Sequence, residues 1–279
     1  MQSGVRPSSV ACYLTAIRKY IRDTTGQPLV SRTIQAVLRG AYQRAAASGQ
    51  VVAHHRPLPA AAAYALLQSA ERCPDLDNFV QLRHFRSFLV PSLGFSIFAR
   101  ANSIFNVAVE DLTCSPTQVL IVLTSLKGRS GTTHLRQLIS IDASHCNGRL
   151  LPLLLRYLHA RAALTAHLDP DWNLFRTETP SRRHALWQLP GDAFRSASTF
   201  CTATLRAGLS AVKLDASYTY HCVRAGAASA ASVVGVPLTT IAKLGDWSVT
   251  SPTLQNSYIQ VVPWSPEAHL FFGYLLPPG

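Results

Sequence analysis

The most specific segment of the sequence reads Tyr220-His221-Cys222-Val223-Arg224-Ala225-Gly226-Ala227-Ala228. In a helix, His221 and Arg224 lie on one face about one turn apart, and the small residues after them allow close packing against neighbouring elements. Thr219 or Ser217 could cap this helix, whose N-terminus would add positive potential beside His221. A His and an Arg that converge at a helix N-terminus can hold a phosphoryl oxyanion. Taken alone, however, the pair fits a buried His and a surface ion pair better.

Other short motifs occur on both sides of this segment. Upstream, Arg100 lies in an apolar stretch that predicts a helix, and Lys127 lies in a Gly-rich stretch that predicts a turn. Downstream, three further motifs read Gly235-Val236-Pro237, Leu244-Gly245-Asp246-Trp247 and Ser257-Tyr258-Ile259. In chain order the residues therefore run Arg, Lys, His-x-x-Arg, Leu-Gly-x-Trp and Tyr.

This order and spacing resemble those of the tyrosine recombinase (phage integrase) family, from Arg100 to Tyr258. The resemblance implies a mostly α-helical fold with a small antiparallel β-sheet, which is the DNA breaking-rejoining catalytic core of that family. It assigns residues 56–279 to the catalytic domain and residues 1–55 to part of a helical, SAM-like core-binding region. The two helices expected in 1–55 are fewer than the four or so usual there, so a truncated N-terminal region is one interpretation.

The resemblance also implies a role for each matching residue. Tyr258 would attack a DNA phosphate and form a 3′-phosphotyrosyl link, which releases a free 5′-hydroxyl. Arg100 and Arg224 would stabilise the charge that grows on the phosphate oxygens. His221 would assist proton transfer to and from Tyr258, and Lys127 would protonate the leaving 5′-oxygen.

The implied partners follow from the same comparison. Because two guanidinium groups would supply the charge stabilisation, the resemblance implies neither a metal nor a cofactor. The six cysteines contain no C-x-x-C pair, which argues against a zinc ribbon or a redox motif. We expect double-stranded DNA as the partner, a homo-tetramer on that DNA, and no membrane.

The sequence departs from the family pattern at two places. The family usually has His or Trp directly after Leu-Gly, where this chain has Asp246, and a carboxylate facing a phosphate would repel it. Trp247, one residue further on, is therefore the predicted site residue, able to donate its indole N–H to the phosphate. The acidic residue that commonly follows the family's first Arg is replaced by Asn102-Ser103, which predicts a less firmly oriented Arg100.

The composition suits a polyanionic partner. Lys and Arg number 26 against 14 Asp and Glu, which gives a net charge of +12. All but four of the 26 are Arg, the residue that fits phosphate oxygens bidentately, although a coding bias would also favour Arg.

A hydrophobic fraction of 48% excludes intrinsic disorder. No apolar run reaches the ~18–20 residues that span a bilayer, and the first residues lack the apolar region of a signal peptide. We expect a soluble intracellular protein, nuclear if eukaryotic and otherwise in the cytoplasm or nucleoid.

Periodicity predicts the remaining elements. The alternation of Val119, Ile121 and Leu123 predicts a strand, which would form a hairpin with a second strand at 132–141 and could pair with a third near 109–113. Helical spacing predicts helices over 60–72, 77–90, 92–105, 151–167, 192–207, 220–234, 238–244 and 253–259, and two more that begin near residues 8 and 31. The apolar tail, 261–279, would pack either on its own core or on a neighbouring copy.

Three functions are compatible with these features. The first is a site-specific recombinase or integrase of a mobile element, and the composition is similar to that of eukaryotic transposon-type recombinases. The second is a catalytically decayed or domesticated DNA-binding protein of the same fold, which Asp246 and the short N-terminal region favour. The third is a type IB topoisomerase, which is less favoured because that family commonly has Lys or Arg at the position of His221.

Overall fold

The computed structural model describes residues 13, 16–17, 20–26, 56–123, 137–169, 184–194, 196–247 and 254–276. The chain divides into two compact units, Met1–His54 and His55–Gly279. In the first unit the described residues from 13 to 25 are helical, as expected for the first N-terminal helix. The second N-terminal helix, expected from residue 31, and the turn that contains Lys127 lie outside the described residues.

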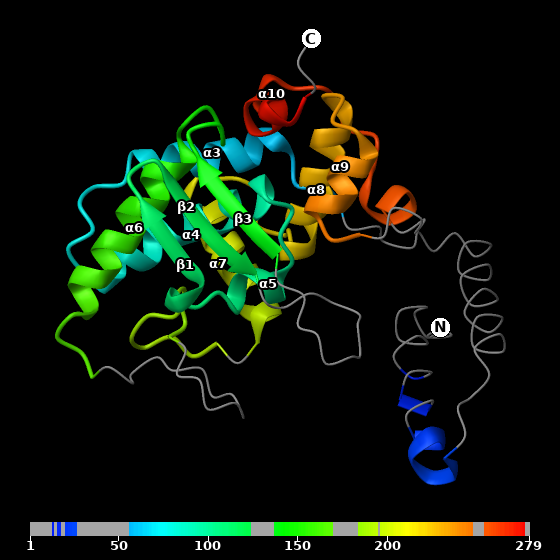
Figure 1. The fold of residues 1–279 in the computed structure, drawn as a ribbon, viewed down its shortest axis with the longest axis horizontal. Coiled ribbons are helices and arrows are strands. Elements are labelled where there is room, and N and C mark those ends of the chain that lie inside the picture. Colours follow the sequence, from blue (N-terminus) through cyan, green and yellow to red (C-terminus); the bar gives the residue numbers. More distant parts are fainter. Residues whose placement is uncertain are drawn as a thin grey trace. The chain divides into compact units, whose positions relative to one another are not determined.

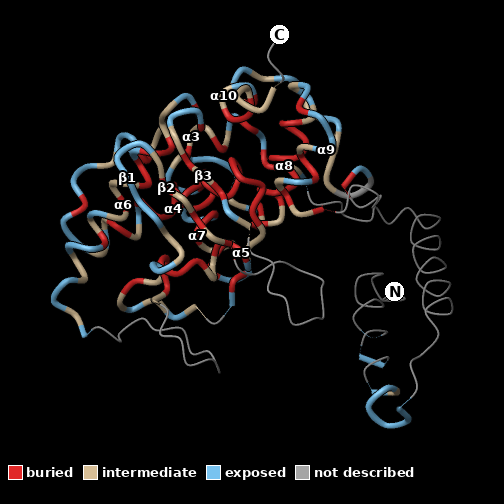
Figure 2. The backbone as a smooth tube through the Cα atoms, in the orientation of Figure 1, coloured by how far each residue is buried: buried red, intermediate tan, exposed pale blue. Residues whose placement is uncertain are grey.

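Helix α4 (Phe79–Ser96) is the centre of the second unit. It begins at Asn78, whose side chain accepts hydrogen bonds from the backbone N–H groups of Val80 and Gln81 at 3.0 Å each. The helix continues through Pro91, beyond its predicted end at residue 90, and its C-terminal half is buried. Four helices pack against it, namely α3 (Ala60–Glu71), α6 (Leu150–Thr165), α7 (Ala197–Ala211) and α8 (Tyr220–Val233). Figure 2 shows that the buried residues concentrate where these helices meet.

A three-stranded antiparallel sheet lies beside the helices (Figure 1). Its order is β1-β2-β3, from β1 (Leu112–Ser115), β2 (Gln118–Leu123) and β3 (Gln137–Asp142). The predicted alternation is confirmed, because the three apolar residues Val119, Ile121 and Leu123 are buried while their neighbours are partly exposed. Helix α6 packs against β2 and β3. The mostly helical fold with a small antiparallel sheet is therefore the one expected from the sequence.

Several predicted element boundaries were wrong. The strand expected near 109–113 begins only at Leu112, because Val109–Asp111 forms a 3₁₀ turn. Helix α7 begins at Ala197 instead of residue 192, because the Ser196 side chain caps it by accepting a hydrogen bond from the Thr199 N–H at 3.2 Å. The helix expected over 253–259 is a single π-helical turn, Leu254–Tyr258.

The prediction of one helix over 92–105, with Arg100 inside it, was also wrong. Helix α4 ends at Ser96, and Phe98 adopts a left-handed backbone conformation with φ of 55°. This conformation interrupts the helical path, so Arg100 becomes the residue that precedes a short helix, α5 (Ala101–Phe105). The break places Arg100 at the end of an element, where its side chain is partly exposed.

The apolar C-terminal segment packs on the core of its own unit. It forms α10 (Pro266–Phe272), whose Phe271 and Phe272 are buried. Their rings lie 4.9 Å from the Phe95 ring and 5.1 Å from the Phe98 ring, respectively, between centroids. Of the two alternatives for this tail, the described part fits packing on its own core.

The small residues of α8 allow the close packing expected from the sequence. A Cβ atom on Gly226 would lie 2.1 Å from the carbonyl oxygen of Leu58, and the Leu58 N–H donates to the Cys222 carbonyl at 2.9 Å. The segment before α3 is thereby held against the helix that carries His221 and Arg224.

We predict that Gly226→Ala destabilises the protein by about 1–3 kcal/mol, because the added methyl group must displace the Leu58 backbone. Urea unfolding followed by circular dichroism measures the change. Val233→Ala, at an exposed position of the same helix, is the control and is expected to shift stability by no more than about 0.5 kcal/mol. Equal unfolding midpoints for Gly226→Ala and the unmodified protein would contradict the packing.

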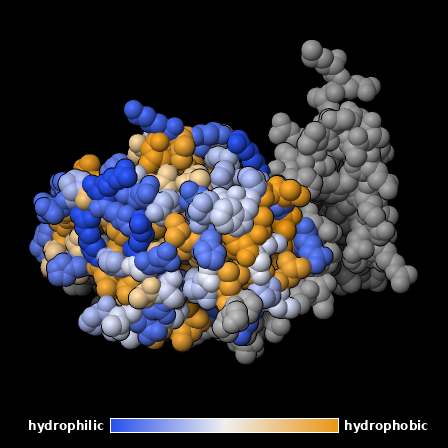
Figure 3. Space-filling model, turned by 90° about the horizontal axis from the view of Figure 1, so that it is seen from above, coloured by the Kyte–Doolittle hydropathy of each residue, from blue (hydrophilic) through white to orange (hydrophobic). Residues whose placement is uncertain are grey.

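The surface of the second unit mixes polar and apolar residues in the face seen in Figure 3. Within the part of the chain that the structure describes, no helix is both long and apolar enough to cross a membrane. The same residues contain no group of three or more His, Cys, Asp or Glu arranged to hold a metal ion.

Candidate active site

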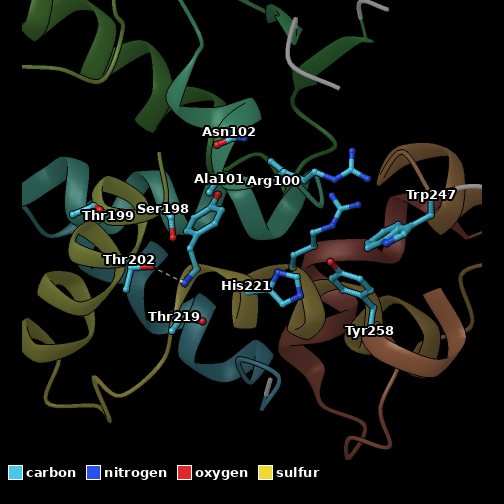
Figure 4. Close-up of a pocket in the computed structure, with 13 residues that line it drawn as sticks. Arg100, Ala101, Asn102, Ser198, Thr199, Thr202, Thr219, His221, Trp247 and Tyr258 are labelled. Atoms are coloured by element: carbon cyan, nitrogen blue, oxygen red, sulfur yellow. Dashed lines mark hydrogen bonds between the residues drawn. The ribbon is translucent and has the colours of Figure 1, made fainter. Parts of the chain in front are cut away.

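A cavity of about 820 Å³ lies among α5, α7, α8, the turn after α9 (Leu238–Leu244) and the π-helical turn. Figure 4 shows that Arg100, Trp247 and Tyr258 line one side of it, with His221 next to Tyr258. Arg224 also lines this cavity. Five of the six residues singled out in the sequence therefore meet in one place, although they are spread over more than half of the chain. Lys127, the sixth, lies outside the described residues.

Arg224 is buried in the wall of the cavity, with 3% of its surface exposed. Its two terminal nitrogens donate hydrogen bonds to the backbone carbonyls of Phe98 and Gly245. The guanidinium carbon lies 3.6 Å from the centroid of the Trp247 ring, a cation–π arrangement. The alternative of a surface ion pair is thus wrong for Arg224, and its position is fixed from three sides.

The environment of Arg224 favours an anionic ligand. Burial lowers the pKa of its guanidinium to about 9, and the neighbouring positive charge of Arg100 acts in the same direction, while Tyr258 opposes them. Arg224 still remains largely protonated near neutral pH. An anion bound between the two arginines would remove their mutual repulsion and raise this pKa again.

Arg100 is held by one residue from a distant part of the chain. One terminal nitrogen donates to the carboxylate of Asp246, and the other donates to the backbone carbonyl of Asp246 at 2.8 Å. The expectation that Arg100 would be less firmly oriented, because Asn102-Ser103 replace an acidic residue, was wrong. The carboxylate comes instead from residue 246, which the sequence indicated only as a group that would repel a phosphate.

Tyr258 lies between two other aromatic rings of the site. Its ring centroid is 4.9 Å from that of His221 and 4.9 Å from that of Trp247. The Ser229 hydroxyl donates to the Tyr258 carbonyl and accepts from the Gln260 N–H, at 3.0 Å each. These contacts join the π-helical turn to α8, so the tyrosine and His221 are held on adjoining elements.

The opposite wall of the cavity was not foreseen from the sequence. It carries the hydroxyl groups of Ser198, Thr199, Thr202 and Thr219, with Asn102 above them (Figure 4). The N-terminal turn of α7 supplies two of these hydroxyls, and the sequence prediction had begun this helix five residues too early. Ser196 was the available signal, because Ser is one of the preferred residues at the N-cap of a helix.

Tyr220 also lines the cavity, and its side chain is buried. Its hydroxyl has no hydrogen-bond partner in the described part of the chain, and burial raises its pKa well above the usual value. The cavity therefore has two tyrosines with different surroundings. Tyr258 adjoins the Arg224 guanidinium, whose carbon lies 5.5 Å from its ring centroid, whereas Tyr220 packs against Gly94, where a Cβ would collide with its hydroxyl.

Solved structures resemble this chain in fold. XerA recombinase is 16% identical, with a TM-score of 0.51, and the match covers 96% of this chain and 82% of XerA. A post-cleavage complex of the XerH site-specific recombinase with a palindromic difH substrate is 14% identical, with a TM-score of 0.48. A lambda integrase dimer bound to a COC′ core site is 14% identical, with a TM-score of 0.42.

The extent of these matches differs. The XerH match covers 72% of this chain but only 49% of XerH, so this chain spans about half the length of that protein. The lambda integrase match covers 93% of this chain and 65% of the integrase. No protein-family model and no curated protein matches the sequence. The similarity to XerA shows a shared fold.

Proposed function

Since the chain has the fold of the tyrosine recombinases, we propose that it is a site-specific DNA recombinase or integrase that cleaves and rejoins strands through a 3′-phosphotyrosyl intermediate. The observation that carries the proposal is the meeting of Arg100, His221, Arg224 and Tyr258 at one cavity. A tyrosine that shares a cavity with two guanidinium groups and an imidazole is suited to attack on a phosphodiester.

In the proposed first step, the Tyr258 oxygen forms a bond to the scissile phosphorus as the bond from phosphorus to the 5′-oxygen breaks. His221, whose ring lies beside that of Tyr258, assists removal of the phenolic proton. Arg100 and Arg224 stabilise the negative charge that increases on the non-bridging oxygens. The reverse step, with a 5′-hydroxyl of another strand, restores the phosphodiester and the free tyrosine.

Two further roles belong to the proposal. Lys127 would give a proton to the leaving 5′-oxygen, as the resemblance to the family implies. Trp247 would donate its indole N–H to the phosphate, and its ring also fixes the Arg224 guanidinium through the stacking described above. The two guanidinium groups supply the charge stabilisation, so the proposed chemistry needs no metal.

The proposed partner is double-stranded DNA, on which four copies of the chain assemble around paired sites. The net charge of +12 supports a polyanionic partner. Because Arg side chains hold phosphates bidentately, both arginines of the cavity suit a DNA strand that enters it. The mobile-element origin suggested by the composition is part of the same proposal.

A second candidate is a protein that binds DNA without cutting it. The pairing of Asp246 with both terminal nitrogens of Arg100 favours this candidate, because a phosphate would meet an arginine that already has an acidic partner. The two candidates differ in one observable property. Both predict retarded DNA in gel-shift assays, and only the recombinase predicts a covalent adduct.

Capture of adducts on genomic DNA tests the proposal and locates the site. The purified protein is incubated with fragmented DNA, denatured with SDS, and the attached DNA is sequenced. The proposal predicts recovery of fragments with a common end, joined to protein at their 3′ phosphate. Retarded DNA without any adduct would favour the second candidate.

DNA affinity is expected to fall with salt, at a slope set by the number of neutralised phosphates, about −0.9 for each. Arg100→Ala should make this slope less steep by about 1, because one phosphate contact is lost. Filter binding between low and moderate salt measures the slope.

Arg149→Ala is the control for this slope, because Arg149, which pairs with Glu71 at 3.2 Å, does not line the cavity. It should leave the slope unchanged. Identical slopes for Arg100→Ala and the unmodified protein would contradict a phosphate contact at Arg100.

A further inference from the structure

We propose that Asp246 is the positioning residue of this site, the acidic group that orients the Arg100 guanidinium toward the cavity. The inference rests on the proposed function for its chemical consequence and on the structure for its geometry. Asp246 stands where the sequence pattern of the family has His or Trp. Orientation of Arg100 by a carboxylate is therefore a different role from the one that a His or Trp would have at this position.

The turn after α9 presents Asp246 to Arg100. Asp246 has a left-handed backbone conformation, with φ of 51°. The N–H groups on either side of this bend return to α9, that of Asp246 to the Lys243 carbonyl at 3.3 Å and that of Trp247 to the Ala242 carbonyl at 2.9 Å. Both the carboxylate and the carbonyl of Asp246 therefore face the same guanidinium.

Two bonds to one residue restrict the guanidinium more than a single ion pair would. Each terminal nitrogen of Arg100 gives one N–H to Asp246, which uses two of the five donors of the group. The remaining donors can serve a phosphate. The Arg100 side chain is 23% exposed and that of Asp246 is 35% exposed. Because such partly exposed pairs stabilise proteins little, the benefit of this pair lies in orientation.

The same turn also holds the second arginine. The carbonyl of Gly245 accepts from Arg224, and the Trp247 ring stacks on the Arg224 guanidinium. A Cβ on Gly245 would overlap the Trp247 ring at 1.8 Å, so this ring position requires glycine there. Residues 245–247 thus contact both arginines, and Asp246 is the member that acts on Arg100.

The turn is tied to the sheet as well. The Gln137 side chain, at the start of β3, donates to the Leu244 carbonyl at 3.0 Å. Movement of the turn is thereby restrained from the α9 side and from the sheet. A restrained turn suits a residue whose task is to hold a side chain in one direction.

A carboxylate beside a phosphate site could instead be a competitor that occupies Arg100. The two interpretations predict opposite effects of Asp246→Asn, which keeps the size and the backbone carbonyl but removes the charge. If the Asp246 carboxylate competes with the phosphate, its removal makes cleavage faster. If Asp246 positions Arg100, removal of its carboxylate makes cleavage slower, even though the loss of a negative charge leaves DNA affinity equal or higher.

The test measures single-turnover adduct formation on a suicide substrate at saturating DNA, together with DNA affinity. For Asp246→Asn we expect the rate to fall about tenfold or more, with affinity unchanged or increased, and for Asp246→Glu we expect part of the rate to return. A rate for Asp246→Asn that equals or exceeds that of the unmodified protein would overturn the inference.

Asp215→Asn is the matched control. Asp215 also pairs with an arginine, Arg56, at 3.3 Å, but it does not line the cavity. Its substitution should leave the adduct rate unchanged. Thermal unfolding of each variant shows whether slower adduct formation comes from a change at the site or from a less stable fold.

Nuclear magnetic resonance of the arginine side chains separates this inference from the proposed function. Without DNA, we expect hindered rotation of the Arg100 terminal groups in the unmodified protein and fast rotation in Asp246→Asn. Fast rotation in both would overturn the positioning role. Hindered rotation with no adduct from the unmodified protein would keep the role of Asp246 and refute the recombinase.

Discussion

Replacement of Tyr258 by Phe is expected to abolish the SDS-resistant adduct with a suicide DNA substrate. Removal of a nucleophile costs about six orders of magnitude in rate in a well-studied enzyme, so the residual adduct should be undetectable. The Phe ring can keep the contacts with His221 and Trp247, both at 4.9 Å between ring centroids. Folding and DNA affinity should therefore remain near those of the unmodified protein, as measured by circular dichroism and gel shift.

The cavity offers a matched control for this change. Tyr220→Phe removes a hydroxyl from the same cavity, but this hydroxyl is buried and has no hydrogen-bond partner in the described residues. Its removal leaves no group unpaired, so adduct formation and stability should be unaffected. An adduct formed by Tyr258→Phe, or one lost in Tyr220→Phe, would assign the nucleophile to another residue.

Arg224→Lys is expected to lower the rate of adduct formation by about 10²–10³-fold, the scale for loss of one oxyanion donor. Arg224 uses its two terminal nitrogens to hold the carbonyls of Phe98 and Gly245 while its guanidinium stays at the cavity. A Lys ammonium is a single point that cannot bond both carbonyls and a phosphate in this geometry. Single-turnover kinetics at saturating DNA measures the effect.

Arg206→Lys provides the comparison for this loss. Arg206 is exposed on α7 and donates to the Tyr218 carbonyl at 3.3 Å, but it does not line the cavity. The rate of adduct formation by Arg206→Lys should stay within about twofold of that of the unmodified protein. If a folded Arg224→Lys protein reacts as fast as Arg206→Lys, Arg224 does not stabilise the transition state.

The elements that the sequence predicted well are those specified by nearby residues. Helix α8 was expected over 220–234 and spans Tyr220–Val233, and α9 agrees with its prediction over 238–244. The alternating residues of β2 lie as expected, because their period of two already assigns one face to the core. The order of Arg, His-x-x-Arg, Trp and Tyr along the chain predicted which residues would meet.

The features that could not be predicted depend on contacts between distant residues. The left-handed conformation of Phe98 breaks the expected helix before Arg100, and the carbonyl of Phe98 accepts from Arg224 far along the chain. The pairing of Asp246 with Arg100 joins residues 146 positions apart. A local pattern shows the charge of Asp246 but not its partner, so the sequence indicated repulsion where the structure has an ion pair.

The positions of the site residues do not by themselves establish the chemical roles expected of Trp247 and Lys127. Trp247 was expected to donate its indole N–H to a phosphate, and the structure places its ring against Arg224 and Tyr258. The two functions are compatible, since one uses the ring face and the other its edge. The role of Lys127 stays a prediction, and its position lies outside the described residues.

Mass spectrometry of the trapped adduct tests the central claim most directly. The protein is reacted with a suicide substrate, digested with nuclease and protease, and the peptide that retains a nucleotide is sequenced. We predict a 3′-phosphonucleotide on the Tyr258 oxygen and on no other tyrosine. A nucleotide on another residue, or no adduct from a folded protein that binds the DNA, would contradict the assignment of Tyr258 as the nucleophile of a recombinase.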